Sequence, residues 1–479
     1  MNKLQGLKPA RVFEYFEAIT QIPRCSFEED QIADYLESFA KDHQLEVLRD
    51  AHNNVVIKKP GTAGYEDKEP LIIQGHMDMV CEKEKTCSID FSKDAIPVQV
   101  EGDLVFSKET TLGADNGIAV AMGLAILDAD DLAHPPLELL VTSNEESGMT
   151  GAKNLDGSML TGKRLLNLDS EQEGVACIAC AAGRRDTLTY QKTTQSPEGE
   201  VFYELSITGL KGGHSGQEIN KGLGNSNVLL GRALYELKDK VELAYIEGGA
   251  KPNAIPRDAR AIITLREAEV IGVQKQIIAL NRDFVKELGN VDPDVRLNLE
   301  KAQSVETVFT EDVKCHIIQA LRLLPNGVQS MSHDIEGLVG ASVNVGVIET
   351  HDDIVVITTN IRSALQSLKE EISMRNRIIA ALTGGRYEII TDYPAWEYTE
   401  HSPIRDAVVS TYRELYGKDI ELEAIHAGLE CGIFKESIGD IDMISIGPNI
   451  RGAHAPGENL SISSTERVYN FVIELLKNL

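Results

Sequence analysis

The sequence predicts an α/β fold in which a mixed, mostly parallel sheet with helices on both faces is interrupted by an inserted α+β domain. Three observations predict it. Strand-like and helix-like segments alternate over residues 1–183, alternating strands and long amphipathic helices follow over 184–392, and the first pattern returns over 393–479. At 479 residues the chain is also too long for a single core. We therefore expect one domain built from both ends of the chain and a second domain inserted into it.

The first segment carries helix and strand signals in turn. Ser26 and Glu29 match a capping box, so a helix with one buried face is expected to follow. The apolar residues of that face recur at helical spacing and are Ile32, Tyr35, Leu36, Phe39 and Ala40. A helix rich in small residues is expected over 116–127. The strand-like apolar runs are 55–59, 71–75, 137–143 and 164–168.

The final segment repeats this pattern. Residues 443–447 predict a buried strand, and Ser463 with Glu466 predicts the start of a helix that covers the sheet. Its apolar face is expected to consist of Val468, Phe471, Val472, Leu475, Leu476 and Leu479. Within the insert, the polarity pattern predicts strands at 202–209 and 259–265 and an amphipathic helix at 224–237.

Charge and composition exclude several classes of partner. The chain has 47 basic and 75 acidic residues and a formal net charge of -28, which repels both nucleic acid and anionic membrane surfaces. No apolar stretch approaches about 18 residues, and the N-terminus lacks the apolar core of a signal peptide. We therefore expect a cytoplasmic protein without nucleic-acid or membrane partners.

The cysteines predict reduced thiols. There are seven, an odd number scattered along a long chain, as is typical of proteins from a reducing compartment. Cys177 and Cys180 form a C-x-x-C pattern, but they lie in an apolar segment without a second pair. Structural zinc or redox chemistry at that pair is therefore the weaker interpretation.

Acidic and histidine side chains follow the predicted strands of the outer segments. They are His76, Asp78, Asp115, Glu145, Glu146, Asp169, His454 and Glu458. In open α/β sheets, sites form just beyond the carboxyl ends of strands. Each residue alone has an ordinary explanation as a helix cap, a solvated loop residue or a packed histidine. Together, carboxylates in one cleft repel one another unless cations neutralise them, so the pattern favours two divalent metals.

The spacing within two of these motifs separates ligands from their supports. His76 and Asp78 are two residues apart and point the same way in an extended segment, so one can bind metal while the other supports it. Glu145 and Glu146 are adjacent and point apart. One can therefore bind metal while the other faces the substrate as a general base.

Five ordered motifs, "GHMDMV", "GADNGIA", "TSNEESGMTGA", "NLDSE" and "HAPGE", resemble those of the di-zinc exopeptidases, a family that includes acylases, glutamate carboxypeptidase and bacterial dipeptidases. Within it, "GHMDMVCEK", "LGADNGIA" and the long insert with "GLKGGHSG" are similar to the aminoacyl-histidine dipeptidase branch, or cytosol non-specific dipeptidases. The resemblance covers essentially the whole chain. It implies a catalytic domain formed by 1–183 and 393–479 and a lid domain formed by 184–392. "MVCEK" departs from the broader family, which weakens transfer of substrate details from the acylases.

The resemblance also implies the roles of the clustered residues. One zinc would be held by His76, Asp115 and Asp169, and the other by Asp115, Glu146 and His454, so that Asp115 is the bridge. Asp78 would orient His76. Glu145 would take a proton from the metal-bridging water and return it to the leaving amine. Cobalt or manganese could occupy the same ligands, and the peptide after Asp115 is typically cis in this family.

Substrate-binding residues are expected mainly in the lid. "GLKGGHSG" alone is equally well explained as a glycine-rich turn, but the resemblance implies that His214 helps to polarise the scissile carbonyl. Arg362 is our candidate for binding the substrate carboxylate, with Asn253 a weaker one, although a surface arginine at a strand end is also ordinary. His426 and Glu430 match a loop that lines the substrate pocket in the family.

These features together predict a metal-dependent dipeptidase that hydrolyses unblocked dipeptides, including Xaa-His substrates such as β-alanyl-histidine, by a di-zinc-bound hydroxide. An N-acyl amino acid amidohydrolase or a tripeptidase with the same site remains the alternative, and a non-catalytic binding protein the remote one. Smaller lids in this family rely on a dimer partner, so a homodimer is one expected arrangement. The insert, at about 210 residues, is roughly twice a small α+β unit, which favours a doubled lid acting within one chain.

Overall fold

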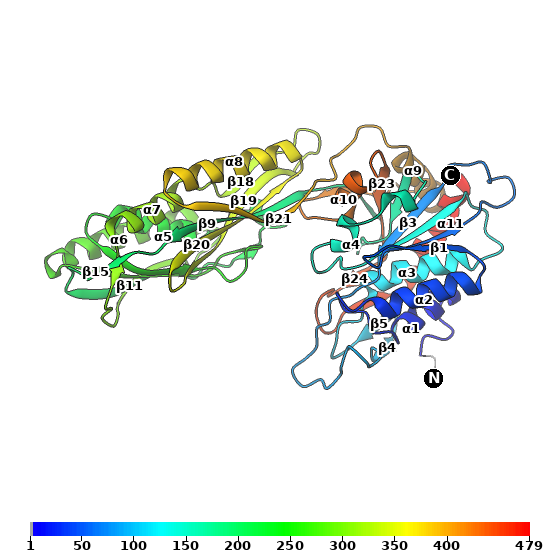
Figure 1. Cartoon of the computed structure of the whole chain (residues 1–479), viewed down its shortest axis with the longest axis horizontal. Helices are drawn as coiled ribbons and strands as arrows, with labels where there is room; N and C mark the ends of the chain where they lie inside the picture. Colours follow the sequence, from blue (N-terminus) through cyan, green and yellow to red (C-terminus); the bar gives the residue numbers. More distant parts are fainter. Residues whose placement is uncertain (1–2) are drawn as a thin grey trace. The chain divides into compact units, whose positions relative to one another are not determined.

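The structure is a computed structural model that describes residues 3–479. The chain forms two compact units. The outer unit comprises Met1–Ala179, Tyr398–Ala424 and Leu429–Leu479, and the inserted unit comprises Cys180–Glu397 and Ile425–Gly428. Figure 1 shows how the first and last parts of the chain, blue to cyan and orange to red, build the outer unit.

The outer unit contains an eight-stranded sheet whose centre is parallel. β3 (Leu71–His76) pairs in parallel with β6 (Leu137–Thr142) and with β7 (Arg164–Asn167), and β7 pairs in parallel with β23 (Asp442–Ser445). Every residue of β3 and β6 is buried, which explains why their sequences are apolar runs without alternation. The parallel centre brings the carboxyl ends of these strands to one edge of the sheet.

The remaining strands flank this centre in the order β1-β2-β6-β3-β7-β23-β8-β22. β1 pairs antiparallel with β2, and β2 pairs antiparallel with β6. At the other side, β8 pairs antiparallel with β23. The flanking strands are β1 (Glu46–Arg49), β2 (Val55–Lys59), β8 (Val175–Cys180) and β22 (Glu421–Ile425). A separate four-stranded sheet in the same unit consists of β4 (Val98–Glu101), β5 (Leu104–Ser107), β24 (Ile450–Arg451) and β25 (Asn459–Ser461).

Helices cover both faces of the eight-stranded sheet. The main hydrophobic core joins one face to α1 (Ala10–Ile19), α2 (Asp30–Asp42), α3 (Ala114–Leu127), α9 (Pro403–Tyr416) and α11 (Ile462–Asn478). The short helices α4 (Thr150–Lys153) and α10 (Glu430–Ser437) lie on the other face, where Glu430 is hydrogen-bonded to Gln74 and Thr142. This arrangement confirms the predicted fold class.

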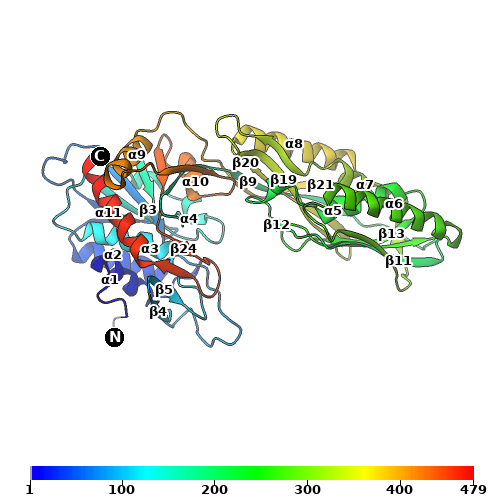
Figure 2. The same ribbon diagram turned by 180° about the vertical axis from the view of Figure 1, so that it is seen from behind.

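The inserted unit is built on a nine-stranded antiparallel sheet. Eight strands follow the order β16-β11-β15-β13-β19-β20-β9-β21, and β18 pairs with β19 beside this path. Figures 1 and 2 show that helices cover one face of this sheet. The strands are β9 (Ala182–Gln191), β11 (Val201–Thr208), β13 (Glu242–Gly248), β15 (Ala259–Leu265), β16 (Arg296–Lys301), β18 (Gly327–Met331), β19 (Val339–Thr350), β20 (Ile354–Ser363) and β21 (Arg386–Tyr393).

The sheet order reveals two similar halves. The helices are α5 (Ser226–Leu237), α6 (Val270–Leu288), α7 (Glu311–Leu323) and α8 (Gln366–Leu382). One half runs β11-α5-β13-β15-α6-β16, which is a βαββαβ unit. The other half places β9, α7, β19, β20, α8 and β21 in an equivalent strand order, with the first half inserted after β9. The two halves meet where β13 pairs with β19. Short strands β10 (Thr194–Gln195), β12 (Gly213–His214), β14 (Ala254–Ile255) and β17 (Val308–Phe309) complete the unit.

Several predicted boundaries differ from the observed ones. The inserted unit begins at Cys180 rather than 184 and ends at Glu397 rather than 392, because the Cys180 and Trp396 backbones pair with each other at the junction. The four-residue return at Ile425–Gly428 had no signal in the sequence.

Both predicted capping boxes are wrong. α2 has no side-chain cap, because the hydroxyl of Ser26 donates a hydrogen bond to Asp78 instead. α11 is capped by Ser461, whose hydroxyl accepts from the Ser464 N–H, and not by Ser463. In α2 a tertiary contact engages the predicted capping serine. In α11 a neighbouring serine is the cap instead. Across residues 3–479, no helix is both long and apolar enough to cross a membrane.

Candidate metal centre and polar cluster of the inserted unit

Three candidate ligands follow adjacent parallel strands of the outer unit. His76 is the last residue of β3, Glu146 lies in the turn after β6, and Asp169 follows β7. His76 is buried, with 1% of its surface exposed, and the side chains of Glu146 and Asp169 are also largely covered. The parallel register of these strands explains why residues distant in the sequence reach one place.

Asp115 and His454 complete the cluster from two connecting segments. Asp115 lies in the first turn of α3, where its φ of -79° and ψ of 105° are not helical, and the Asp115–Asn116 peptide is cis, as the resemblance implies. His454 lies between β24 and β25 with a φ of 65°. A histidine rarely adopts this left-handed conformation, which costs about 1–3 kcal/mol and clusters at functional sites.

The five side chains form two groups that share Asp115. His76 Nε2 lies 3.1 Å from Asp115 Oδ1 and 3.4 Å from Asp169 Oδ1. His454 Nε2 lies 3.2 Å from Asp115 Oδ2 and 2.9 Å from Glu146 Oε2. One carboxylate therefore faces a histidine with each of its two oxygens, which is the arrangement expected of a residue that bridges two cations.

The electrostatics of this cluster favour cations. Burial opposes the charging of His76, but the Asp169 charge and hydrogen bonds to Asp115 and Asp169 outweigh it, so the pKa of His76 lies well above its usual range. Hydrogen bonds to Asp115 and Glu146 raise the pKa of His454 to about 11. Burial, together with the neighbouring carboxylates, raises the pKa of Asp169 to about 6. The carboxylates thus favour positive charge in the cluster. The two histidines can supply that charge only by binding protons.

The donor set also fits divalent metal ions chemically. One ligand atom each from His76, Asp115 and Glu146 lies within 4.8 Å of the other two. The Oε1 atom of Glu146 is buried and has no hydrogen-bond partner among residues 3–479. A buried carboxylate oxygen without a donor is costly unless a cation takes that place. Imidazole nitrogens mixed with carboxylate oxygens suit zinc and other borderline divalent ions.

Asp78 orients His76 and also supports the glutamate turn. His76 Nδ1 lies 3.4 Å from Asp78 Oδ1 and 3.1 Å from the Asp78 carbonyl oxygen, so the Nδ1 proton faces these acceptors and Nε2 is left to bind a metal. The same carboxylate accepts hydrogen bonds from the backbone N–H groups of Glu145 and Glu146. One buried side chain therefore fixes a candidate ligand and the candidate base together.

Glu145 has the environment of a proton-transfer residue. No hydrogen bond to its carboxylate is found within residues 3–479, and its backbone N–H donates to Asp78. Burial raises the pKa of Glu145 well above its usual range, and the charges of Asp169, Glu430 and Glu146 add to this effect against that of His76. A raised pKa makes this carboxylate a stronger proton acceptor, which suits a general base.

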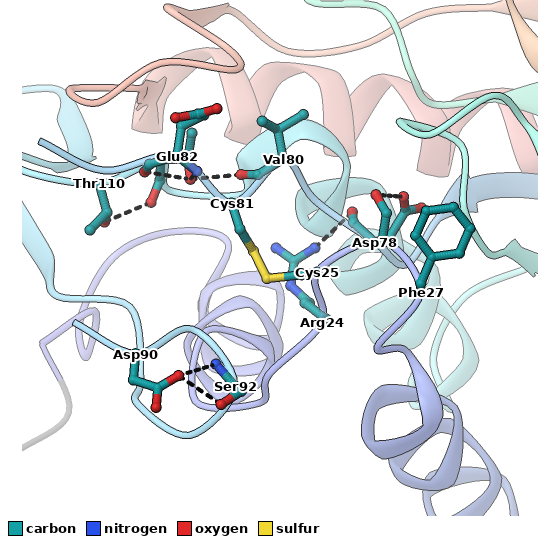
Figure 3. Close-up of a disulfide and its surroundings, with 12 residues drawn as sticks. Arg24, Cys25, Phe27, Asp78, Val80, Cys81, Glu82, Asp90, Ser92 and Thr110 are labelled. Carbon is teal, nitrogen blue, oxygen red and sulfur yellow. Dashed lines mark hydrogen bonds between the residues drawn. A yellow bond between two sulfur atoms is a disulfide. The ribbon is translucent and has the colours of Figure 1, made fainter.

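The segment before α2 supports the centre, although sequence reasoning missed it. The buried Arg24 guanidinium donates to the carbonyl oxygens of Met77, Asp78 and Gly113. Figure 3 shows Arg24 and Asp78 close to the Cys25–Cys81 disulfide. Arg24 follows no recognisable motif, and only the tertiary packing reveals its place.

The expectation of reduced thiols is wrong for one pair. Cys25 and Cys81 form a disulfide, with Cα atoms 5.7 Å apart and a sequence separation of 56. An odd number of cysteines argued against pairing, but it could not exclude a single bridge between segments that the fold brings together. The bridge joins the Arg24 segment to the loop that follows Asp78.

Glu430 lies beneath the centre rather than on an accessible surface. Its side chain is fully buried, and Oε2 accepts hydrogen bonds from Gln74 at 2.7 Å and Thr142 at 2.8 Å. Burial raises its pKa to about 8. Glu430 therefore supports the strand ends from below.

A second polar cluster forms within the inserted unit. His214 ends β12, and its Nδ1 accepts hydrogen bonds from the backbone N–H groups of Gly216 at 3.3 Å and Gln217 at 3.1 Å. This fixes the proton of the neutral imidazole on Nε2. Burial and the nearby Arg362 charge lower the pKa of His214. His214 is therefore a neutral N–H donor at physiological pH.

Arg362 and His426 lie in the same cluster. Arg362, on β20, is 8% exposed and donates a hydrogen bond to the Tyr393 hydroxyl. Its Nε has no partner in the part of the chain that the structure describes. His426 Nε2 lies 2.7 Å from the Ser342 hydroxyl, and burial with the charges of Arg362 and His214 lowers the pKa of His426 to about 3. A Cβ on Gly216 would lie 3.0 Å from the His214 ring and 3.2 Å from Arg362 Nε, so glycine permits this close approach.

Asn253 lies close to His214 in the fold, and its backbone makes the contact with the His214 segment. β12 pairs with β14, so His214 is opposite Ala254, and the Asn253 carbonyl oxygen accepts a hydrogen bond from the Ser215 N–H. The Asn253 side chain is exposed. It is therefore available to a ligand, whereas Arg362 and His426 are nearly covered by the protein.

Comparison with known proteins agrees with this geometry. The family model described as Peptidase family M20/M25/M40 matches residues 72–478. The cytosol non-specific dipeptidase of Escherichia coli (strain K12) is 38% identical over 483 residues, covering 100% of this chain and 99% of that protein.

Solved structures give the same result. The aminoacylhistidine dipeptidase of Vibrio alginolyticus superposes with a TM-score of 0.92 at 37% identity, covering 99% of this chain and 97% of that one. The aminopeptidase PepT of Bacillus cereus, at 15% identity with a TM-score of 0.57 over 98% of this chain and 99% of that one, shares the fold. The five motifs, the paired histidine–carboxylate groups and the match over residues 72–478 lead to one conclusion: the chain is a metallopeptidase and belongs to peptidase family M20/M25/M40.

Proposed function

We propose that this protein is a metal-dependent dipeptidase that hydrolyses unblocked dipeptides, including Xaa-His substrates of the β-alanyl-histidine type. The arrangement of two histidines and two further carboxylates around the two oxygens of Asp115 carries this proposal. Full-length similarity to a cytosol non-specific dipeptidase and an aminoacylhistidine dipeptidase supports the substrate class.

Two zinc ions are the proposed cofactors, and cobalt or manganese suits the same donors. His76, Asp115 and Asp169 would hold one ion, and Asp115, Glu146 and His454 the other. When bound, such ions polarise the scissile carbonyl and lower the pKa of water.

The protein's own residues supply proton transfer and orientation. Glu145 accepts a proton from the attacking water and delivers it to the leaving amine, a role that its lack of competing hydrogen bonds and its raised pKa support. Asp78 holds His76 in the tautomer that leaves Nε2 free, and it holds the backbone of Glu145 at the same time.

The polar cluster of the inserted unit is proposed to bind the substrate. His214 presents a neutral Nε2–H group, which suits an oxygen that gains negative charge. Arg362 has an unpartnered Nε and a guanidinium fork that suits a free α-carboxylate. His426 lies near enough to Arg362 for the Arg362 charge to lower its pKa, and the exposed Asn253 amide completes the proposed set. Glu430, which the resemblance also implies, is fully buried and would act by supporting the strand ends.

The proposed partners are small peptides, with no nucleic acid or membrane, and the proposed assembly is a monomer or a homodimer. The cytoplasm is the proposed location, supported by the name of the Escherichia coli relative. The Cys25–Cys81 disulfide bears on this point, because cytoplasmic thiols are ordinarily kept reduced. Counting the free thiols of the protein after they are blocked in intact cells tests the location and the disulfide together.

A small substrate panel tests the function. It contains β-alanyl-histidine, glycyl-histidine, leucyl-glycine, a tripeptide and an N-acetyl amino acid, each assayed before and after chelation. Chelator-sensitive cleavage restricted to the dipeptides supports the proposal. Cleavage of the acetylated substrate alone assigns the protein to the amidohydrolases, dominant tripeptide cleavage assigns it to the tripeptidases, and no turnover with any metal contradicts an enzymatic role.

A further inference from the structure

Glu458 is the one acidic residue of the late "HAPGE" motif that the proposed metal ligands do not use. Its side chain is 1% exposed. Oε2 accepts hydrogen bonds from the backbone N–H groups of Leu112 at 2.7 Å and Gly113 at 2.9 Å. Oε1 accepts from those of Ala114 at 2.8 Å and Asp115 at 3.2 Å. A carboxylate has about four acceptor sites, and here four backbone donors occupy them, so Glu458 is satisfied without a metal.

The four donors belong to the turn that carries Asp115. Those of Gly113, Ala114 and Asp115 are N–H groups at the start of α3, which no helical carbonyl can reach, and that of Leu112 comes just before the helix. A buried carboxylate that binds all four fixes the path of the backbone into Asp115, and its charge is favourable at a helix N-terminus. On the other side of the same turn, the guanidinium of Arg24 binds the Gly113 carbonyl oxygen. The turn is therefore held from both sides by buried charged side chains.

Glu458 also ties this turn to the loop that carries His454. The two residues are four positions apart, and the Glu458 carbonyl oxygen accepts from the Ser107 N–H, while the Gly457 N–H donates to Thr110. The loop is thereby attached to β5 and to the segment between β5 and the Asp115 turn. His454 and Asp115 are 339 residues apart in sequence, and Glu458 is the side chain that connects their two backbones.

We propose that Glu458 is a positioning residue of the metal centre: its carboxylate sets the backbone of Leu112–Asp115 relative to the His454 loop and so holds Asp115 where both histidines reach it. This inference rests on the proposed function. A residue that orients metal ligands typically contributes about 10–100-fold to metal affinity. The second ion should be affected most, because it depends on Asp115 and His454 together.

The test compares Glu458→Gln with a matched control, Glu138→Gln. Glu138 is equally buried, at 2%, and its carboxylate also accepts backbone N–H groups, from Thr161 and Gly162. It lies near the opposite, amino end of β6, away from the metal centre. In both variants an amide NH₂ group would face backbone donors, so both lose stability. Only Glu458→Gln should also lose metal.

Zinc affinity is measured by competition with a chromophoric chelator, alongside the melting temperature of the chelated protein. For Glu458→Gln we expect the second zinc to bind 10–100-fold more weakly, whereas Glu138→Gln binds two ions as the wild type does. The cobalt-loaded proteins provide a spectroscopic readout: magnetic coupling between two ions should weaken in Glu458→Gln alone. Unchanged metal affinity and coupling in a destabilised Glu458→Gln protein would make Glu458 a fold anchor only and overturn the inference.

A measurement on the wild-type protein covers the case in which Glu458→Gln does not fold. Hydrogen exchange is followed over residues 112–115 after chelation. The inference predicts that these amides stay protected without metal, because Glu458 already binds them. Free exchange that becomes slow only on metal addition would show that the metal organises the turn and would contradict the inference. A wild-type protein that binds no metal would instead contradict the proposed function.

Discussion

The two units each contain a pair of histidines among polar groups, but their electrostatics are opposite. In the outer unit, carboxylates surround His76 and His454 and raise their pKa values. In the inserted unit, burial and the charge of Arg362 lower the pKa values of His214 and His426. The same residue type therefore lies in two opposite electrostatic environments. We propose that the outer unit binds cations and that the inserted unit binds electron-rich or anionic groups.

The largest expected effect is that of removing the proposed base from the outer unit. Glu145→Gln should lower kcat by about 10³-fold while two metal ions remain bound, because the amide keeps the shape but cannot accept the proton. Glu146→Gln is the matched variant and should lose metal as well as turnover. Metal analysis beside steady-state kinetics separates the two. A Glu145→Gln enzyme with wild-type kcat would remove Glu145 from the mechanism.

A smaller effect is expected from the neutral histidine of the inserted unit. His214→Ala should lower kcat by about 10²-fold, since one donor to a developing oxyanion is lost, and metal content should not change. His351→Ala, an exposed histidine of the same unit, is the control. Loss of metal on substitution of His214 would contradict the division of roles between the units.

Arg362→Ala should act mainly on substrate binding. We expect KM to rise about 10–100-fold for dipeptides with a free carboxylate, because a charge-assisted contact contributes about 1.5–3 kcal/mol. C-terminally amidated dipeptides should lose much less. Arg386→Ala on β21, an exposed arginine, should change neither KM. Equal losses on free and amidated substrates would exclude carboxylate recognition by Arg362.

The smallest effect concerns the fully buried carboxylate of Asp186 on β9. Its Oδ1 has no hydrogen-bond partner among the described residues, and burial raises its pKa to about 6 against the opposing effect of the Arg184 charge. An unfolded aspartate has a pKa of about 3.9, so the native state binds this proton more tightly than the unfolded state does. The protein therefore loses stability as the pH rises from about 4 through 6. Asp186→Asn should therefore stabilise the protein by about 1–2 kcal/mol at pH 8. Little change is expected at pH 4, and denaturant unfolding at both pH values provides the check.

The outer unit could be predicted well from sequence, because its buried parallel strands appear as apolar runs and its candidate ligands follow them directly. The fold class and the family are confirmed. The residues that hold the candidate ligands in place could not be predicted in the same way. Arg24 acts through carbonyl oxygens more than 50 residues away, and the donors to Glu458 are backbone groups, which leave no mark in a side-chain pattern.

The inserted unit was harder to predict for a related reason. Its doubled βαββαβ arrangement depends on strand pairing between distant segments, such as β9 with β20 and β21, which no local pattern encodes. The short return at Ile425–Gly428, which brings His426 into this unit, follows from tertiary contacts alone. The sequence named these polar residues, but the lowered pKa values of His214 and His426 follow from burial that only the fold creates.

Metal stoichiometry is the most direct test of the division between the two units. Each protein is stripped, titrated with zinc and analysed for metal per chain. The account predicts two ions for the wild type, for His214→Ala and for Arg362→Ala, and fewer than two for Asp115→Asn and His454→Ala. Two tightly bound ions in Asp115→Asn, or loss of metal on changing only His214 or Arg362, would contradict the account.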